Sequence, residues 1–212
     1  ENDWLGDYAL FMALKRHFGM KAWTEWEDED IRRRVSDEVV ESYRVKLAAD
    51  CRLFTYIQYL FYKQWNALHT YANENGIQII GDVPIYVPRD SVEVWCNPEL
   101  FKLDEKLDPV EIAGCPPDAF SADGQLWGNP LYNWDYMKKD GFGWWIRRVD
   151  GAIRLFDIVR IDHFRGLESY WAVPAESDTA KVGQWEKGPG MDLLHVLKTW
   201  FWYADVDYIA ED

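Results

Sequence analysis

Three apolar runs of strand character constrain this chain most, because each is followed at once by a carboxylate. The runs are IQIIG before Asp82, IVRI before Asp162 and YIA before Glu211. Helical patterns lie between successive runs, and this strand, helix, strand order predicts a parallel sheet. Side chains alternate along a strand, so Arg160 and Asp162 share one face. In a parallel β/α barrel the groups at the carboxyl ends of the strands meet at one site, so we expect these side chains to converge.

Each carboxylate taken singly could have a purely structural role, as a helix cap or in a surface ion pair. Three carboxylates in phase with three strands are less easily explained in that way. Burying an aspartate beside an arginine is costly unless each satisfies the other or the pair has a chemical role. Like charges crowded together shift pKa values and separate an acid from a nucleophile, so the pattern favours a catalytic site.

The first part of the chain has a helical pattern up to about Asn75, with a glycine stop at Gly76. A long helical region runs from about Ile31 to Tyr71, with a break near Ser36. Within it, large apolar side chains recur at helical spacing, and we expect them to lie in the core: Phe54, Ile57, Leu60, Phe61, Trp65 and Leu68. The sequence therefore predicts a helical subdomain over residues 1–75.

The rest of the chain, residues 76–212, is predicted to form a partial catalytic β/α barrel that is truncated at both ends. Segments between its strands are expected to be long inserted loops or helices. Pro88–Asn133 is rich in Pro, Gly, Asn and Trp and predicts irregular structure, as does a second loop that contains Glu186–Gly190. Helices are expected at about Trp134–Leu155 and Asp192–Tyr203.

The composition limits the partners. The 212 residues carry a formal net charge of −14, which would repel nucleic acid or an anionic membrane, so a neutral substrate fits better. No stretch is long and apolar enough to predict a membrane span. The cysteines are odd in number and widely spaced, with no metal-binding pattern, which indicates reduced thiols in a cytoplasmic protein. We expect neither a metal nor another cofactor.

Five motifs together resemble one known family. They are GDVPIYV at Gly81–Val87, GQLWGNPLYNW at Gly124–Trp134, RIDHFRG at Arg160–Gly166, YWAVP at Tyr170–Pro174 and IAED at Ile209–Asp212. In this order they resemble the amylomaltases, which are the 4-α-glucanotransferases or disproportionating enzymes of glycoside hydrolase family 77 in the α-amylase superfamily. The resemblance extends over nearly the whole chain.

The resemblance implies a retaining double displacement on α-1,4-linked glucose. By analogy with the family, Asp162 is the nucleophile and Glu211 is first the general acid and then the general base. Two such carboxyl groups are expected roughly 5–5.5 Å apart. Arg160 is expected to keep Asp162 ionised and oriented, and Asp82 and His163 match positions that bind the sugar at or beside the cleavage point.

A loop of the same family lies over the acceptor side of the site. The matching residues are Asp118, Ser121, Gln125, Trp127 and Asn129. Trp127 would supply a stacking face, while Gln125 and Asn129 would bond sugar hydroxyls. A loop of this kind can exclude water and so favour an acceptor sugar over hydrolysis.

The implied fold is α/β, a partial TIM (β/α)8 barrel with about three central strands, a helical subdomain and long inserted loops. A full barrel needs roughly 250 residues, and the family's third aspartate is expected beyond Asp212. We therefore expect the parent enzyme to act on malto-oligosaccharides and α-glucans in starch and glycogen metabolism, and residues 1–212 alone to be inactive.

Two other functions stay open. An α-glucan hydrolase of the same superfamily would share the first half-reaction and would release glucose and short products from maltotriose, without longer chains. A non-catalytic glucan-binding module would use the aromatic side chains and would tolerate replacement of Asp162. The intact strand-end carboxylates favour an enzyme.

Overall fold

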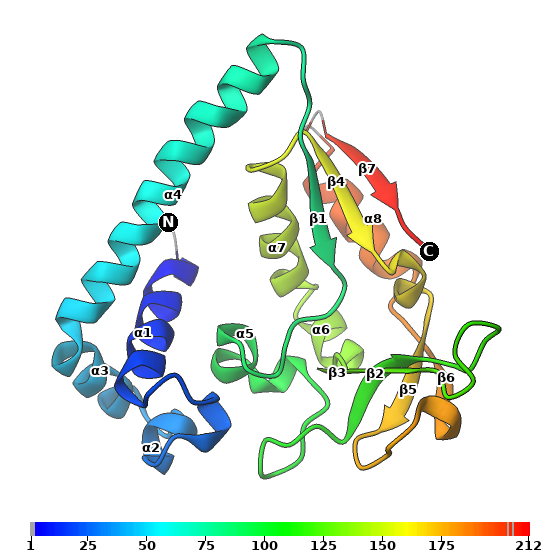
Figure 1. Ribbon diagram of the computed structural model, residues 1–212, viewed down its shortest axis with the longest axis horizontal. Helices are drawn as coiled ribbons and strands as arrows, with labels where there is room; N and C mark the ends of the chain where they lie inside the picture. Colours follow the sequence, from blue (N-terminus) through cyan, green and yellow to red (C-terminus); the bar gives the residue numbers. More distant parts are fainter. Residues whose placement is uncertain (1–2, 203, 205) are drawn as a thin grey trace. The chain divides into compact units, whose positions relative to one another are not determined.

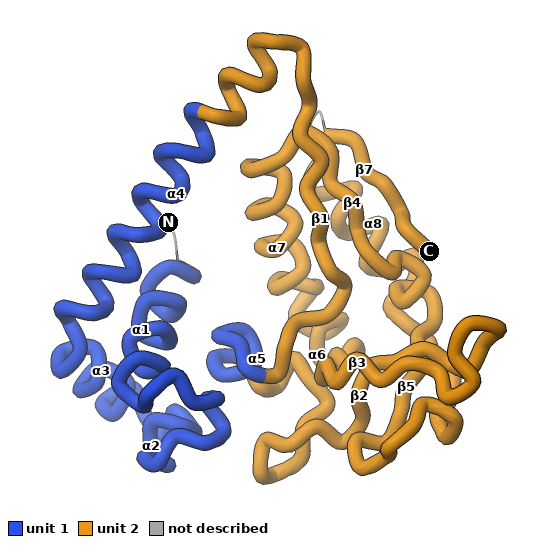
Figure 2. The backbone as a smooth tube through the Cα atoms, in the orientation of Figure 1, with its two compact units in different colours: residues 1–67, 90–97 blue, residues 68–89, 98–212 orange. Residues whose placement is uncertain are grey.

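The structure is a computed structural model that describes residues 3–202, 204 and 206–212. The chain forms two compact units, drawn in separate colours in Figure 2: residues 1–67 with 90–97, and residues 68–89 with 98–212. The sequence pattern had placed a single division after residue 75, and that division into domains stays a prediction. Nothing in the local pattern indicated that residues 90–97 return to the first unit.

Unit 1 is helical. Its elements are α1 (Asp3–His17), η1 (Trp23–Glu25), α2 (Glu29–Arg32), α3 (Asp37–Lys46), the greater part of α4 (Ala48–Glu74) and α5 (Val92–Cys96). The predicted break near Ser36 is confirmed, because its hydroxyl accepts a hydrogen bond from Val39 N and caps α3. Asp28 caps α2 in the same way. Buried aromatic rings fill the core of this unit, among them Phe11, Trp23, Trp26 and Trp95.

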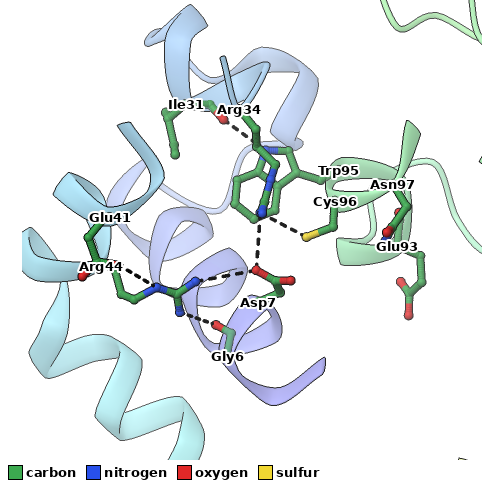
Figure 3. Close-up of polar contacts among 10 residues, drawn as sticks. All are labelled: Gly6, Asp7, Ile31, Arg34, Glu41, Arg44, Glu93, Trp95, Cys96 and Asn97. Atoms are coloured by element: carbon green, nitrogen blue, oxygen red, sulfur yellow. Dashed lines mark hydrogen bonds and ion pairs between the residues drawn. The ribbon is translucent and has the colours of Figure 1, made fainter. Parts of the chain in front are cut away.

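A polar cluster ties α5 to this core, as Figure 3 shows. The Arg34 guanidinium lies 4.5 Å from the centre of the Trp95 ring, and its Nη1 is 3.2 Å from Cys96 Sγ and 3.5 Å from Asp7 Oδ1. Trp95 Nε1 in turn donates to the Ile31 carbonyl at 3.2 Å. These contacts hold α5 to a turn and a helix that precede it by more than 60 residues, so they are tertiary contacts that no local pattern could indicate.

The apolar side chains that recur at helical spacing along α4, here called the α4 stripe, were predicted to lie in the core, and this prediction is wrong. Ile57, Phe61 and Leu68 are 45%, 45% and 55% exposed, and Ala72 is the buried residue of the helix. Helical spacing shows which side chains share a face, but whether that face is buried depends on what covers it.

Unit 2 contains the predicted parallel sheet, visible in Figure 1. It consists of β1 (Ile80–Pro84), β4 (Ile158–Asp162) and β7 (Asp207–Ala210), in the order β1-β4-β7. Helices α6 (Trp134–Lys139), α7 (Gly143–Ile153) and α8 (Met191–Trp200) belong to the same unit, and α7 packs against β4 and α8. Tyr203, the predicted end of the last helix, lies outside the described residues.

Strand alternation separates the core from the site. Val83, Val159 and Ile161 are buried together with Ala152 of α7, so the intervening side chains of β1 and β4 point to the other face. A Cβ atom at Gly81 would lie 1.9 Å from the Phe156 ring, which explains a glycine within this strand.

The segments predicted as irregular loops instead contribute β2 (Glu111–Cys115), β3 (Gln125–Pro130) and part of β6 (Gln184–Lys187) to a second sheet, which β5 (Ser169–Pro174) completes. This sheet is antiparallel, with the order β3-β2-β5-β6. These strands have four to six residues, and β2 carries a bulge between Ile112 and Gly114. Short strands whose partners lie far away in sequence leave little local signal, which is why the pattern failed.

The remaining short elements are η2 (Pro98–Leu100), η3 (Phe164–Leu167) and η4 (Ala180–Val182). The helices in the described part of the chain include none with the length and apolar character required to cross a bilayer.

Candidate active site

Arg160 is the centre of a charged cluster at the carboxyl ends of the three parallel strands. It lies opposite Asp82 in the β1–β4 register, and its Nη1 contacts Asp82 Oδ1. Its Nη2 lies 3.0 Å from Asp162 Oδ1 and 3.4 Å from Glu211 Oε1. The convergence of three strand-end carboxylates and one arginine, which the sequence predicted, is thus present in the structure.

The carboxylates of this cluster are open to solvent while the arginine is more covered. The side chains of Asp82, Asp162 and Glu211 are 62%, 46% and 39% exposed, and that of Arg160 is 29% exposed. The hydrogen bond to Asp82 raises the pKa of Arg160, and the charges of Asp82 and Glu211 add to this effect. A permanently charged guanidinium therefore faces a larger number of acidic groups at an accessible edge of the sheet.

The turn after β4 fixes the backbone of Glu211. Its main-chain N donates to Ile161 O at 3.2 Å, and its carbonyl accepts from Phe164 N at 2.6 Å. Its side chain accepts from His163 N, with 3.0 Å between the nitrogen and Oε2. His163 adopts a left-handed backbone conformation with φ 53°, which is uncommon for a residue other than glycine and accords with a functional turn.

The His163 side chain is half-buried and meets an aromatic partner from the second sheet. Its ring lies 4.9 Å from that of Trp127, at right angles to it. Burial lowers the pKa of His163, although the nearby charges of Asp162 and Glu211 act in the opposite direction. Trp127 Nε1 donates to Gln125 Oε1 at 3.1 Å, so Gln125 adjoins this pair.

Three predicted site residues contact loop backbone rather than the charged cluster. Asp118 Oδ1 accepts from Phe120 N and Ser121 N at 2.8 and 2.7 Å, and Ser121 Oγ donates to Gly124 O. Asn129 Nδ2 donates to Val87 O at 3.0 Å. The structure thus brings Asp82, Arg160, Asp162, His163 and Glu211 together and brings Trp127 to them through His163. Gln125 adjoins Trp127, while Asp118 lies in a loop with Ser121 and Asn129 lies in β3.

Two residues near the site were missed from the sequence. Tyr86 lies inside the GDVPIYV motif and its ring centre is 6.3 Å from that of Trp127, so the motif itself was the available signal. Arg148 binds the backbone beside Tyr86, but in the sequence it reads as an ordinary helical arginine.

No group of three or more His, Cys, Asp or Glu side chains in the described ranges is arranged to hold a metal ion. The acidic groups at the strand ends are held by the Arg160 guanidinium instead.

Carboxylates that gather around an arginine at the carboxyl edge of a parallel sheet place this chain among the β/α-barrel proteins with an acidic site. The comparisons with known proteins agree with this class. The profile of glycoside hydrolase family 77 (Glyco_hydro_77), described as 4-alpha-glucanotransferase, matches residues 1–212, and the chain belongs to this family.

Individual relatives support the assignment. The chain is 51% identical to a 4-alpha-glucanotransferase of Streptococcus pneumoniae over 99% of its own length and 41% of the relative's. It is 48% identical to the 4-alpha-glucanotransferase of Clostridium butyricum, over 100% and 43%. The chain thus spans less than half the length of the curated relatives that it matches.

Solved structures give the same result for the fold. The amylomaltase from Streptococcus agalactiae in complex with acarbose superposes with a TM-score of 0.93 and 50% identity, over 99% of this chain and 42% of that one. The prediction of a TIM-barrel fragment with three parallel strands is therefore confirmed.

Proposed function

We propose that the protein to which this chain belongs is a 4-α-glucanotransferase that transfers α-1,4-glucan segments between malto-oligosaccharides. Family membership and the names of the relatives support this activity. The observation that carries it is the contact of one guanidinium, that of Arg160, with Asp82, Asp162 and Glu211 at the edge of the sheet.

In the first half-reaction, an Asp162 carboxylate oxygen attacks the anomeric carbon of the donor. The bond from that carbon to the glycosidic oxygen breaks, and Glu211 gives its proton to the departing oxygen. Both carboxyl groups approach the same nitrogen of Arg160, at 3.0 and 3.4 Å, a closeness that suits the short separation of a retaining pair. The Arg160 guanidinium, 3.0 Å from Asp162 Oδ1, would orient this carboxylate for the attack.

In the second half-reaction, the 4-hydroxyl of an acceptor sugar gives its proton to the Glu211 carboxylate. The acceptor oxygen bonds to the anomeric carbon while the bond to Asp162 breaks, which regenerates both groups and retains the anomeric configuration. The transferase and a hydrolase differ only in whether a sugar or a water attacks at this step.

The surrounding side chains would hold the sugars. Asp82 and His163 lie beside the nucleophile, and the Trp127 ring, in contact with His163, offers a face on which a sugar ring can stack. The Gln125, Asp118 and Ser121 side chains would serve the acceptor side. The amide nitrogen of Asn129 is engaged by Val87 O, which leaves its oxygen to accept from a sugar hydroxyl. The acarbose bound by the Streptococcus agalactiae relative supports a glucan as ligand.

The proposal extends to the cellular compartment in which the enzyme acts. Cys51, Cys96 and Cys115 are free thiols, which fits a reducing compartment, and we assign the protein to the cytoplasm and to the metabolism of starch or glycogen.

The proposal is tested in the full-length protein with Asp162→Asn and Glu211→Gln, using maltotriose and an activated glycosyl fluoride. We expect Asp162→Asn to lower transfer from both donors by about 10³-fold or more. Glu211→Gln should block maltotriose but still permit slow attack on the fluoride, since fluoride needs little acid assistance. Near-normal turnover by Asp162→Asn would refute the assignment, and chromatography that shows glucose without maltopentaose in the unaltered enzyme would favour the hydrolase.

A further inference from the structure

The segment Pro84–Val87, here called the exit segment, leads the chain out of β1 just beyond Asp82. Pro84 is the last residue of β1, and the three residues after it have irregular backbone, yet Ile85, Tyr86 and Val87 are only 2%, 6% and 7% exposed. Buried carbonyl groups outside a helix or sheet need other hydrogen-bond partners.

Side chains from two later parts of unit 2 supply those partners. Arg148 of α7 donates from Nη1 to Ile85 O at 2.9 Å and from Nη2 to Pro84 O. The Tyr132 hydroxyl donates to the same Ile85 carbonyl at 2.7 Å. With the Asn129 amide on Val87 O, three of the four carbonyl groups of the exit segment are held by side chains.

Arg148 is itself firmly placed. Its guanidinium lies 5.0 and 5.2 Å from the ring centres of Trp144 and Trp145, and Nη1 is 3.1 Å from the Tyr132 hydroxyl. Tyr132 is fully buried and stacks on Tyr86 at 5.8 Å. A planar guanidinium can bind two neighbouring carbonyl groups at once in this setting, whereas a lysine ammonium lacks the fork.

The exit segment touches the active site through two of its side chains. A Cβ atom at Gly166 would lie 2.8 Å from Ile85 Cδ1 and 2.9 Å from His163 Cδ2, so Ile85 and the His163 ring pack against the same glycine. Tyr86 contacts Trp127, which in turn contacts His163. A shift of the exit segment therefore moves both rings of the His163–Trp127 pair.

We propose that Arg148 is a positioning residue of this site: it holds the exit segment and, through Ile85 and Tyr86, sets the His163–Trp127 pair against which the sugar binds. The proposal rests on the glucanotransferase function for its effect on turnover. Loss of the guanidinium leaves the Pro84 carbonyl without its side-chain donor, and the His163–Trp127 pair loses its fixed orientation. Turnover depends steeply on such orientation, so kcat/KM should fall about 10- to 100-fold, mainly through kcat.

The experiment compares Arg148→Met and Arg148→Lys in the full-length protein with a matched control, Arg147→Met, at the exposed neighbouring position of the same helix. Maltotriose kinetics give kcat and KM. Histidine-selective NMR gives a readout that does not depend on activity, because the Trp127 ring shifts the signals of His163 through its ring current. The His163 signal is identified by its absence in His163→Gln.

The expected result is a displaced His163 signal and the loss of kcat in Arg148→Met, a smaller effect of both kinds in Arg148→Lys, and neither in Arg147→Met. An unmoved His163 signal in Arg148→Met, or equal effects of Arg147→Met, would overturn the proposal. If Arg148→Met has no cooperative melt, Tyr132→Phe serves as a milder variant, because it removes only one hydrogen-bond donor from Ile85 O. The position of the His163 signal in that variant then tests the proposal. Because the signal is read without turnover, a wrong assignment of Asp162 would be recognised separately.

Discussion

Arg34 in unit 1 and Arg160 in unit 2 are two arginines of similar exposure with different surroundings. The side chains are 24% and 29% exposed. Arg34 meets one carboxylate, a thiol and an indole ring, all from helices of its own unit (Figure 3). Arg160 meets three carboxylates from or directly after three neighbouring strands. The first arginine is surrounded by mixed contacts that join elements, and the second by an excess of accessible acids.

This difference is the one expected between a structural arginine and an arginine of the proposed active site. Mixed contacts with a ring and a thiol satisfy an arginine without leaving charge available to a ligand. A cluster with more acids than bases, each acid partly exposed, is stable only because solvent screens it, and it is available for chemistry. Replacing each arginine should therefore damage a different property of the full-length protein.

The largest effect is expected for Arg160→Met. Without the guanidinium, the carboxylates of Asp82, Asp162 and Glu211 lose their shared counter-charge and repel one another, so kcat/KM for maltotriose should fall about 10²-fold or more. Because the acids are exposed, the unfolding midpoint should move little. Kinetics and a thermal melt measure the two properties, with Arg160→Lys as the matched variant that keeps the charge. A large fall in the melting temperature with preserved kcat/KM would instead show that Arg160, like Arg34, has a structural role.

For Arg34→Met we expect a moderate loss of stability with little change in kcat/KM, the reverse of the result expected for Arg160→Met. The variant loses the contacts to Asp7 and Cys96 and the stacking on Trp95, which should lower the stability of unit 1 by roughly 1–3 kcal/mol. The kcat/KM should stay within about twofold, since none of these contacts involves the acidic cluster. Calorimetry on Arg34→Met and Arg34→Lys tests this expectation, and an unchanged melt would contradict it.

The smallest effect concerns Cys96, beside Arg34. Burial raises the pKa of this thiol to about 12, and the nearby Arg34 only partly offsets it. At pH 8 roughly one Cys96 in 10⁴ is then the reactive thiolate, so its alkylation should be slower than that of Cys51 or Cys115. Peptide mass spectrometry measures the three rates. Arg34→Met should accelerate Cys96 alkylation as the helices loosen, whereas Arg160→Met should leave the rate unchanged. Acceleration by both variants would contradict the independence of the Arg34 contacts from the Arg160 contacts.

Local pattern predicted the acidic cluster well and its surroundings poorly. Val159 and Ile161 alternate with Arg160 and Asp162, and a period of two assigns opposite faces whatever the rest of the chain does. Arg148 gave no such signal, because an arginine on an amphipathic helix has the same pattern whether it meets water or a carbonyl group. The contact of the Asn129 amide nitrogen with Val87 O, across 42 residues, likewise gave no local signal.

The sequence by itself determined the parallel strands, the carboxylates that follow them and the family, since these depend on residues close together in the chain. The tertiary structure alone decided the second sheet, in which β2 pairs with β5 across almost 60 residues, and the exposure of the α4 stripe. It also decided that Arg34 contacts one carboxylate group in this comparison whereas Arg160 contacts three. Burial and strand pairing depend on residues that are distant in the sequence and become neighbours only when the chain folds. A local sequence pattern therefore does not specify them.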